Sequence, residues 1–132
     1  MEKIEHLGIA VKSLAESIPI FEKLLNTECY KTEIVASENV KTAFLKIGGS
    51  KIELLESTDA NGVIAKFISK NGEGVHHIAL EVMNIDEEIS RLTRSGFIVL
   101  NEPKKGADNK LICFLHLKST NGILIELCQE IE

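Results

Sequence analysis

Two segments of the chain share one pattern of apolar and polar positions. "HLGIAVKSLAESI", which begins at His6, and "HIALEVMNIDEEI", which begins at His77, align without a gap. In each segment an alternating, strand-like run leads to Ser13 or Asn84, with glutamate three residues later, the capping-box pattern of a helix start. Apolar residues then recur every three or four positions, so a helix is predicted after each strand.

Two further strand-like runs follow each predicted helix. Gly48-Gly49-Ser50 joins them in the first segment and Asn121-Gly122 in the second, and both sequences are typical of hairpin turns. One more strand is expected before each hairpin, in "ECYKTEIV" and in "FIVL". Each repeat therefore predicts a β-α-β-β-β unit, with a short helix in "NGVIAKFISKNGEG" between the two. We expect one α+β domain over residues 1–132, with repeat units at approximately 1–57 and 73–132.

Composition excludes several classes of partner. The chain of 132 residues has a formal net charge of −5, which disfavours binding to nucleic acid or to an anionic membrane. No apolar run reaches the length of a membrane span, and a signal peptide is not expected because "MEKIEHLGIAV" leads directly into a strand pattern. Three cysteines without metal-type spacing are typical of reduced thiols, which predicts a cytoplasmic protein.

Four polar residues interrupt strands that are otherwise apolar. Alternation places His6 and His77 on the side of their strands with small neighbours, opposite the large aliphatic residues. Glu53 in "KIELLE" and Glu126 in "ILIELC" each lie between aliphatic residues that face the other way. A buried carboxylate is costly unless it is paired, hydrogen-bonded or bound to a metal.

A single histidine in a strand is more often a packed core residue, and a single glutamate usually faces water. Four such residues at positions related by the repeat favour a shared role instead. Two imidazoles and two carboxylates form a suitable ligand set for a divalent metal with open positions.

At these residues the sequence resembles the vicinal oxygen chelate superfamily. More narrowly it is similar to methylmalonyl-CoA epimerases, in "HLGIAV", "KIELLE", "IAKFISKNGEGVHHIALEV", "GFIVLNEPKKGA" and "FLHLKSTNGILIEL". The resemblance implies two tandem β-α-β-β-β units in an open, cupped, barrel-like mixed sheet. It makes His6, Glu53, His77 and Glu126 ligands of a divalent cation such as Co, Mn, Ni or Zn.

The implied reaction interconverts (R)- and (S)-methylmalonyl-CoA by 1,1-proton transfer through a metal-stabilised enolate. Two acid/base groups must flank one carbon, and we expect Glu126 to be one of them. Some family members carry the second as a glutamate at the position of Thr42, where a hydroxyl is a poor base. We therefore expect Glu53 to take this role, with Glu38 as the fallback. The family's "FLHPK" is "FLHLK" in this chain, where we expect only a mild change of the loop.

Substrate contacts are expected mainly in basic loops. The stretch "PKKGADNK" carries Lys104, Lys105 and Lys110, which could meet the phosphates or carboxylate of an acyl-CoA, and Lys118 is nearby in sequence. His116 and Thr42 are further candidates for contact with substrate. The open sheet of the family makes a homodimer plausible.

Three alternatives stay open at this point. A glyoxalase I-type lactoylglutathione lyase would use the same metal and the same proton-transfer chemistry. A metal-free binding protein of the same fold would have no need for buried carboxylates. An oxygenase is disfavoured because a second carboxylate occupies a position that oxygen would need.

Overall fold

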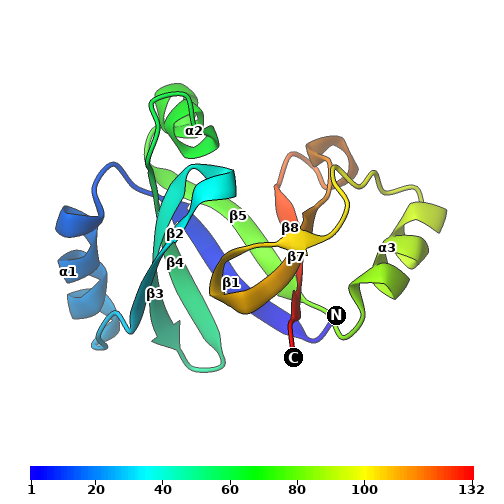
Figure 1. The fold of residues 1–132 in the computed structure, drawn as a ribbon, viewed down its shortest axis with the longest axis horizontal. Helices are drawn as coiled ribbons and strands as arrows, with labels where there is room; N and C mark the ends of the chain where they lie inside the picture. Colours follow the sequence, from blue (N-terminus) through cyan, green and yellow to red (C-terminus); the bar gives the residue numbers. More distant parts are fainter. The chain divides into compact units, whose positions relative to one another are not determined.

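The computed structural model describes residues 1–132 and divides them into two compact units. One unit spans His6–His76, and the other combines Met1–Glu5 with His77–Glu132. Strands β1 (Lys3–Ala10) and β5 (Gly74–Glu81) contribute residues to both units (Figure 1). Each unit holds most of one sequence repeat, and the expectation of one domain over residues 1–132 stays a prediction.

The first unit has the predicted order of elements. After β1 come the helix α1, the strands β2, β3 and β4, and the helix α2, with a short 3-10 turn η1 before β3. Their bounds are α1 Leu14–Leu25, β2 Lys31–Val35, η1 Ala36–Glu38, β3 Val40–Ile47, β4 Ser50–Ser57 and α2 Val63–Asn71. The two-residue loop Gly48-Gly49 closes the β3–β4 hairpin, and Gly48 has the positive φ of 58° that favours glycine.

The second unit repeats this order after β5. The helix α3 and the strands β6, β7 and β8 follow, with two 3-10 turns between them. Their bounds are α3 Ile85–Arg94, β6 Lys104–Lys105, η2 Ala107–Asn109, β7 Lys110–Phe114, η3 Leu117–Ser119 and β8 Ile125–Glu130. The predicted β-α-β-β-β units are therefore confirmed, and none of the helices is long and apolar enough to span a membrane.

The strands are hydrogen-bonded in the order β2-β3-β4-β1-β5-β8-β7-β6, and the pairing is mixed. In the first unit β1 is parallel to β4, and β4 is antiparallel to β3. In the second unit β5 is likewise parallel to β8, and β8 is antiparallel to β7. This confirms the expected α+β class with a mixed sheet.

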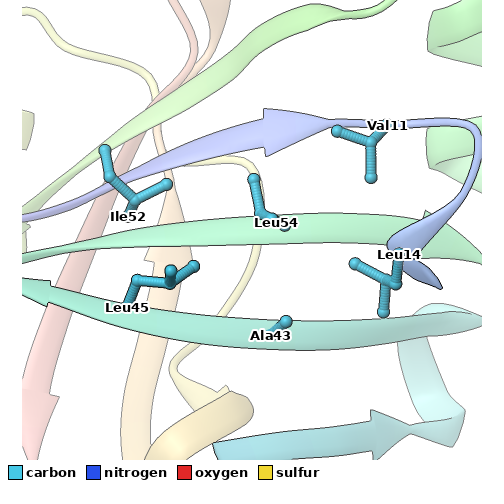
Figure 2. Close-up of a cluster of buried hydrophobic side chains, with 6 residues drawn as sticks. All are labelled: Val11, Leu14, Ala43, Leu45, Ile52 and Leu54. Atoms are coloured by element: carbon cyan, nitrogen blue, oxygen red, sulfur yellow. The ribbon is translucent and has the colours of Figure 1, made fainter. Parts of the chain in front are cut away.

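Each first helix of a repeat starts at the predicted cap and covers an apolar strand surface. The Ser13 hydroxyl accepts a hydrogen bond from the Glu16 N–H, and the Asn84 side chain accepts one from the Glu87 N–H. Helix α1 then packs against β3 and β4 over a core of six buried residues (Figure 2). These are Val11, Leu14, Ala43, Leu45, Ile52 and Leu54. The side of the strands opposite the histidines is thus filled by aliphatic packing.

The strand expected in "FIVL" is reduced to a single bridge between Val99 and Leu115. Side chains replace the main-chain partners that a longer strand would need. The Ser119 hydroxyl accepts from the Ile98 N–H, and the Asn101 side-chain oxygen accepts from the Phe114 N–H. Local polar side chains thus compete with the sheet ladder, which an apolar pattern alone does not reveal.

The turn expected at Asn121-Gly122 is present, since these residues have φ values of 54° and 81°. It is not a tight hairpin loop, however, because β7 ends at Phe114 and β8 begins at Ile125. The connection between them also contains the 3-10 turn η3, which His116 caps.

Candidate metal centre

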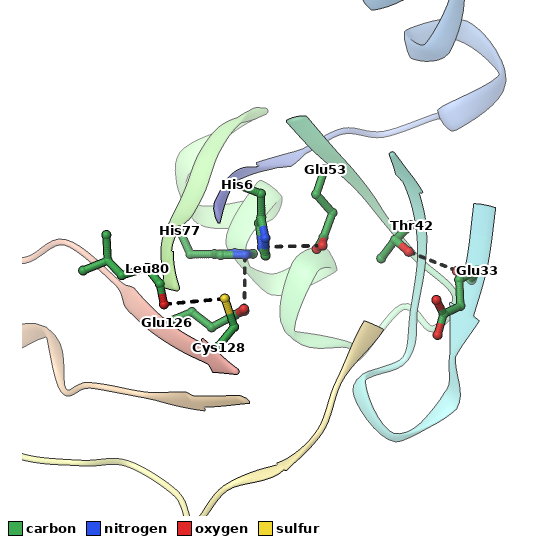
Figure 3. Close-up of polar contacts among 8 residues, drawn as sticks. All are labelled: His6, Glu33, Thr42, Glu53, His77, Leu80, Glu126 and Cys128. Carbon is green, nitrogen blue, oxygen red and sulfur yellow. Dashed lines mark hydrogen bonds and ion pairs between the residues drawn. The ribbon is translucent and has the colours of Figure 1, made fainter. Parts of the chain in front are cut away.

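The first unit brings His6 and Glu53 together on neighbouring strands. The parallel register places Glu53 of β4 beside Gly8 of β1, two residues beyond His6. These residues share one face of the sheet, and the His6 Nε2 atom lies 3.5 Å from a Glu53 carboxylate oxygen (Figure 3). Glycine at position 8 leaves room on this face for the two polar side chains.

The second unit builds the same pair from the other repeat. Glu126 of β8 lies beside Ala79 of β5, two residues beyond His77. The His77 Nε2 atom lies 3.4 Å from a Glu126 carboxylate oxygen (Figure 3). The two pairs thus match in strand type, register and distance.

Each glutamate has a small residue as its partner on one adjacent strand and a phenylalanine as its partner on the other. Phe44 of β3 is the register partner of Glu53, and Phe114 of β7 is that of Glu126. The Phe114 ring meets the His77 ring edge to face, with 6.0 Å between centroids. Sequence reasoning missed both rings, although "AFL" and "CFL" occupy matching positions in the two repeats.

All four polar residues are buried. His6 and His77 are each 4% exposed, Glu53 is 6% exposed and Glu126 is 5% exposed. The alternative that these glutamates face water is therefore wrong. Two carboxylates held this far from solvent need compensation, and the imidazole beside each supplies part of it.

The spacing within each pair fits two ligands of one ion. Separations of 3.5 and 3.4 Å exceed the usual hydrogen-bond distance of about 2.9–3.0 Å. Two donor atoms at about 2.1 Å from a tetrahedral ion lie roughly 3.4 Å apart. The chemistry of the donors fits as well, because imidazole nitrogen and carboxylate oxygen both bind divalent first-row metals.

Thr42 is buried at 1% exposure on the same face of the sheet as Glu53. Its hydroxyl donates to the main-chain carbonyl oxygen of Glu33, its register partner on β2, at 3.3 Å (Figure 3). The hydroxyl thus holds the edge strand, and it offers no group that could titrate near neutral pH. The fallback residue Glu38 lies in the turn η1, outside the strands.

The remaining expected substrate contacts lie in the second unit. His116 caps the turn η3, where its Nδ1 atom accepts a hydrogen bond from the Lys118 N–H at 3.0 Å. Lys104 and Lys105 form the exposed edge strand β6, paired with β7. None of these four residues belongs to a His–Glu pair.

Three further groups on the same strands are poorly suited to chemistry: Cys113, the half-buried His76 and Cys128. Burial raises the pKa of the Cys113 thiol to about 11, with the Glu126 carboxylate adding to the shift, so this thiol stays protonated at neutral pH. Burial also lowers the pKa of His76, which packs edge-on against Phe67 of α2. Cys128 is fully buried and its thiol donates to the Leu80 carbonyl oxygen, so it packs in the interior of the second unit.

The fold that carries these His–Glu pairs has known counterparts. A model of the Glyoxalase/Bleomycin resistance protein/Dioxygenase superfamily matches residues 5–114. The chain belongs to this superfamily. The expected family resemblance is thereby confirmed.

Its relatives within the superfamily include epimerases. An ethylmalonyl-CoA/methylmalonyl-CoA epimerase from Cereibacter sphaeroides is 36% identical over 130 residues, which cover 96% of this chain and 97% of that protein. A variant of the Streptomyces coelicolor methylmalonyl-CoA epimerase, solved in complex with 2-nitronate-propionyl-CoA, has a TM-score of 0.93 at 35% identity, covering 98% of this chain and 95% of that one. A hypothetical protein from Bacillus halodurans has a TM-score of 0.95 at 44% identity, covering 98% and 95%.

Proposed function

We propose that this protein is a metal-dependent epimerase that interconverts (R)- and (S)-methylmalonyl-CoA. The observation that carries the proposal is the pair of matched, buried His–Glu arrangements in a chain whose relatives include methylmalonyl-CoA epimerases. Solved relatives also bind this class of compound, since one is in complex with methylmalonyl-CoA. The substrate is then an acyl-CoA thioester that has an acidic proton between two carbonyl carbons.

We propose His6, Glu53, His77 and Glu126 as the ligands of one divalent cation, with Co, Mn, Ni and Zn as candidates. The repeat supports this set, because each unit supplies one imidazole and one carboxylate in the same register. Bound there, the cation would supply positive charge for the thioester oxygen as charge develops on it, worth several kcal/mol.

The protein's own part in the reaction is proton transfer at one carbon. We assign Glu126 and Glu53 as the two acid/base groups. Both carboxylates are held by a neighbouring imidazole and both are shielded from water, so each is oriented before substrate binds. Because they come from the two repeats, they are the natural candidates for opposite faces of the substrate.

Replacing Glu53 by glutamine tests this assignment. The amide keeps an oxygen that can bind the metal but cannot take a proton, so we expect retained metal and a kcat lowered by about 10²-fold or more. Metal content by mass spectrometry and racemisation followed by circular dichroism measure the two effects separately. Retained metal with near-normal turnover would show that Glu53 is only a ligand.

The substrate class is tested by proton exchange in deuterated water. We expect exchange of the α-proton of methylmalonyl-CoA and none with the hemithioacetal of methylglyoxal and glutathione. Turnover of the hemithioacetal alone would instead identify a glyoxalase I-type lyase, and the fold and pairs described above would still stand.

The proposal also covers the substrate contacts, the oligomeric state and the cellular compartment. Lys104, Lys105, His116, Lys118 and Thr42 stay candidates for substrate contact. We also propose a homodimer in the cytoplasm. Three cysteines without disulfide partners support a reducing compartment, and the edge strand β2, with Ile34 66% exposed, offers a surface for association.

A further inference from the structure

The face of the sheet that carries Glu53 becomes basic towards the β3–β4 hairpin. Alternation places Lys51 of β4 on this face, two residues from Glu53, and the register pairs it with Lys46 of β3. Lys31 of β2 is the register partner of Phe44 and faces the same way. Three lysines thus share the face of the His6–Glu53 pair, in a chain with a formal net charge of −5.

Aromatic rings hold two of these ammonium groups in place. The Lys51 Nζ atom lies 5.9 Å from the centroid of the Phe44 ring, and the Lys46 Nζ atom lies 5.2 Å from that of Tyr30. The two rings are themselves neighbours, with 6.0 Å between centroids. Cation–π attraction of this kind orients the lysines before a ligand arrives, which lowers the entropic cost of binding.

The third ammonium group is held by charge. The Lys31 Nζ atom lies 3.2 Å from a carboxylate oxygen of Glu33 on the same strand. This pair partly neutralises the charge of Lys31, so we assign Lys31 only an assisting role.

The other repeat has no lysine at the matching positions. Counting from Phe114 and Glu126, the positions that match Lys46 and Lys51 hold His116 and Leu124. The second unit also has two lysines on the face of Glu126, but Lys104 and Lys110 lie beyond Phe114 on the side away from His116, and Lys110 is buried and paired with Glu130. The two repeats therefore differ in where the lysines lie relative to the glutamate. An asymmetric ligand with one additional anionic group would fit this difference.

We propose that Lys51 and Lys46, assisted by Lys31, bind the free carboxylate of a malonyl-type thioester. This rests on the proposed function and names the group on the substrate that these residues recognise. Lys51 lies over Phe44, the strand neighbour of Glu53, and its own register partner on β1 is His6, so it is next to the proposed metal ligands on the sheet. The phosphates of CoA are separated from the reacting carbon by the whole pantetheine arm, which makes the carboxylate the nearer anion.

Chemistry gives the lysines a further role. Removal of a proton from a carbon next to a carboxylate adds a second negative charge to the same small group. An ammonium ion on the carboxylate offsets this repulsion and makes the α-proton more acidic. The lysines would thus favour carboxylated thioesters over neutral acyl thioesters both in binding and in turnover.

Binding of two phosphate-free probes, malonyl-pantetheine and acetyl-pantetheine, tests the proposal without reliance on turnover. In calorimetric titrations of the metal-loaded protein we expect wild type to prefer the malonyl probe. The double variant Lys46→Gln, Lys51→Gln should lose about 10- to 100-fold of that preference, as expected for charged hydrogen bonds. Arginine at position 51 should restore much of it.

Lys41 provides the matched control, since it is an exposed lysine on β3 that faces the other side of the sheet. Lys41→Gln should leave the preference unchanged. Loss of binding to both pantetheine probes alike, or loss only with the CoA forms that carry phosphates, would overturn the carboxylate assignment. Absence of α-proton exchange in wild type would contradict the proposed function instead, and the binding preference would still decide the role of the lysines.

Discussion

Replacing Glu126 by glutamine should lower kcat for epimerisation by about 10²- to 10⁴-fold, the usual contribution of a positioned general base. The carboxylate is 5% exposed and is held 3.4 Å from the His77 imidazole, so no water is well placed to take over its role. Glutamine has nearly the same shape and keeps a carbonyl oxygen for the metal. The loss should therefore fall on proton transfer more than on folding.

The measurement is α-proton exchange and racemisation of methylmalonyl-CoA, with metal content determined on the same sample. Glu130→Gln is the matched control, because Glu130 lies on the same strand and face but is exposed and paired with Lys110. This control should retain wild-type turnover. A Glu126→Gln protein that holds metal and turns over within a factor of about ten of wild type would remove Glu126 from the acid/base pair.

The sequence was most informative where the repeat doubled a signal. One histidine or one glutamate in a strand has several explanations, but His6 with Glu53 and His77 with Glu126 occur at matching positions twice. The helix N-caps Ser13 and Asn84 could also be predicted, because an N-cap depends on local sequence alone. The two pairs, the two caps and the order of elements therefore followed from the chain before any coordinates.

The remaining features depend on register, which alternation within one strand does not supply. Phe44 and Phe114 are strand neighbours of the glutamates only because of how β3 and β7 pair. Lys31 comes to the face of Glu53 by the same route, through β2. Lys104 and Lys105, which the sequence predicts as substrate contacts, are neighbours along the chain. Those beside Glu53 are clustered only across strands.

Local hydrogen bonding accounts for the shortened strand. The apolar run "FIVL" satisfied the pattern of a strand, yet the side-chain oxygen of Asn101 takes the N–H of Phe114 that a neighbouring strand would have used. Such substitution of main-chain by side-chain partners depends on spacing between segments. Such hydrogen bonds cannot be predicted until the positions of both segments in the fold are known.

Removal of the proposed metal is the second change for which we expect a large effect. Both the turnover and the stability of the protein should fall. Chelation should reduce turnover by about 10³-fold or more, because several kcal/mol of charge stabilisation are lost and each 1.4 kcal/mol is worth about tenfold. The melting temperature should fall as well, since a ligand that binds only the native state stabilises it. Without the cation two buried carboxylates lose a source of compensation for their charge, and each still lies beside an imidazole.

The experiment compares chelator-treated protein with protein treated with the same chelator already saturated with calcium. Addition of Co, Mn, Ni or Zn in stoichiometric amounts should restore turnover and melting temperature together, and the order of recovery would identify the preferred ion. His6→Ala and His77→Ala provide an independent route to the same state, because each removes one ligand from a different repeat. If the two pairs bind one ion, either variant should lose most of the metal. If each pair bound its own ion, each variant would keep about half of the metal of wild type, and the single-centre proposal would have to be abandoned.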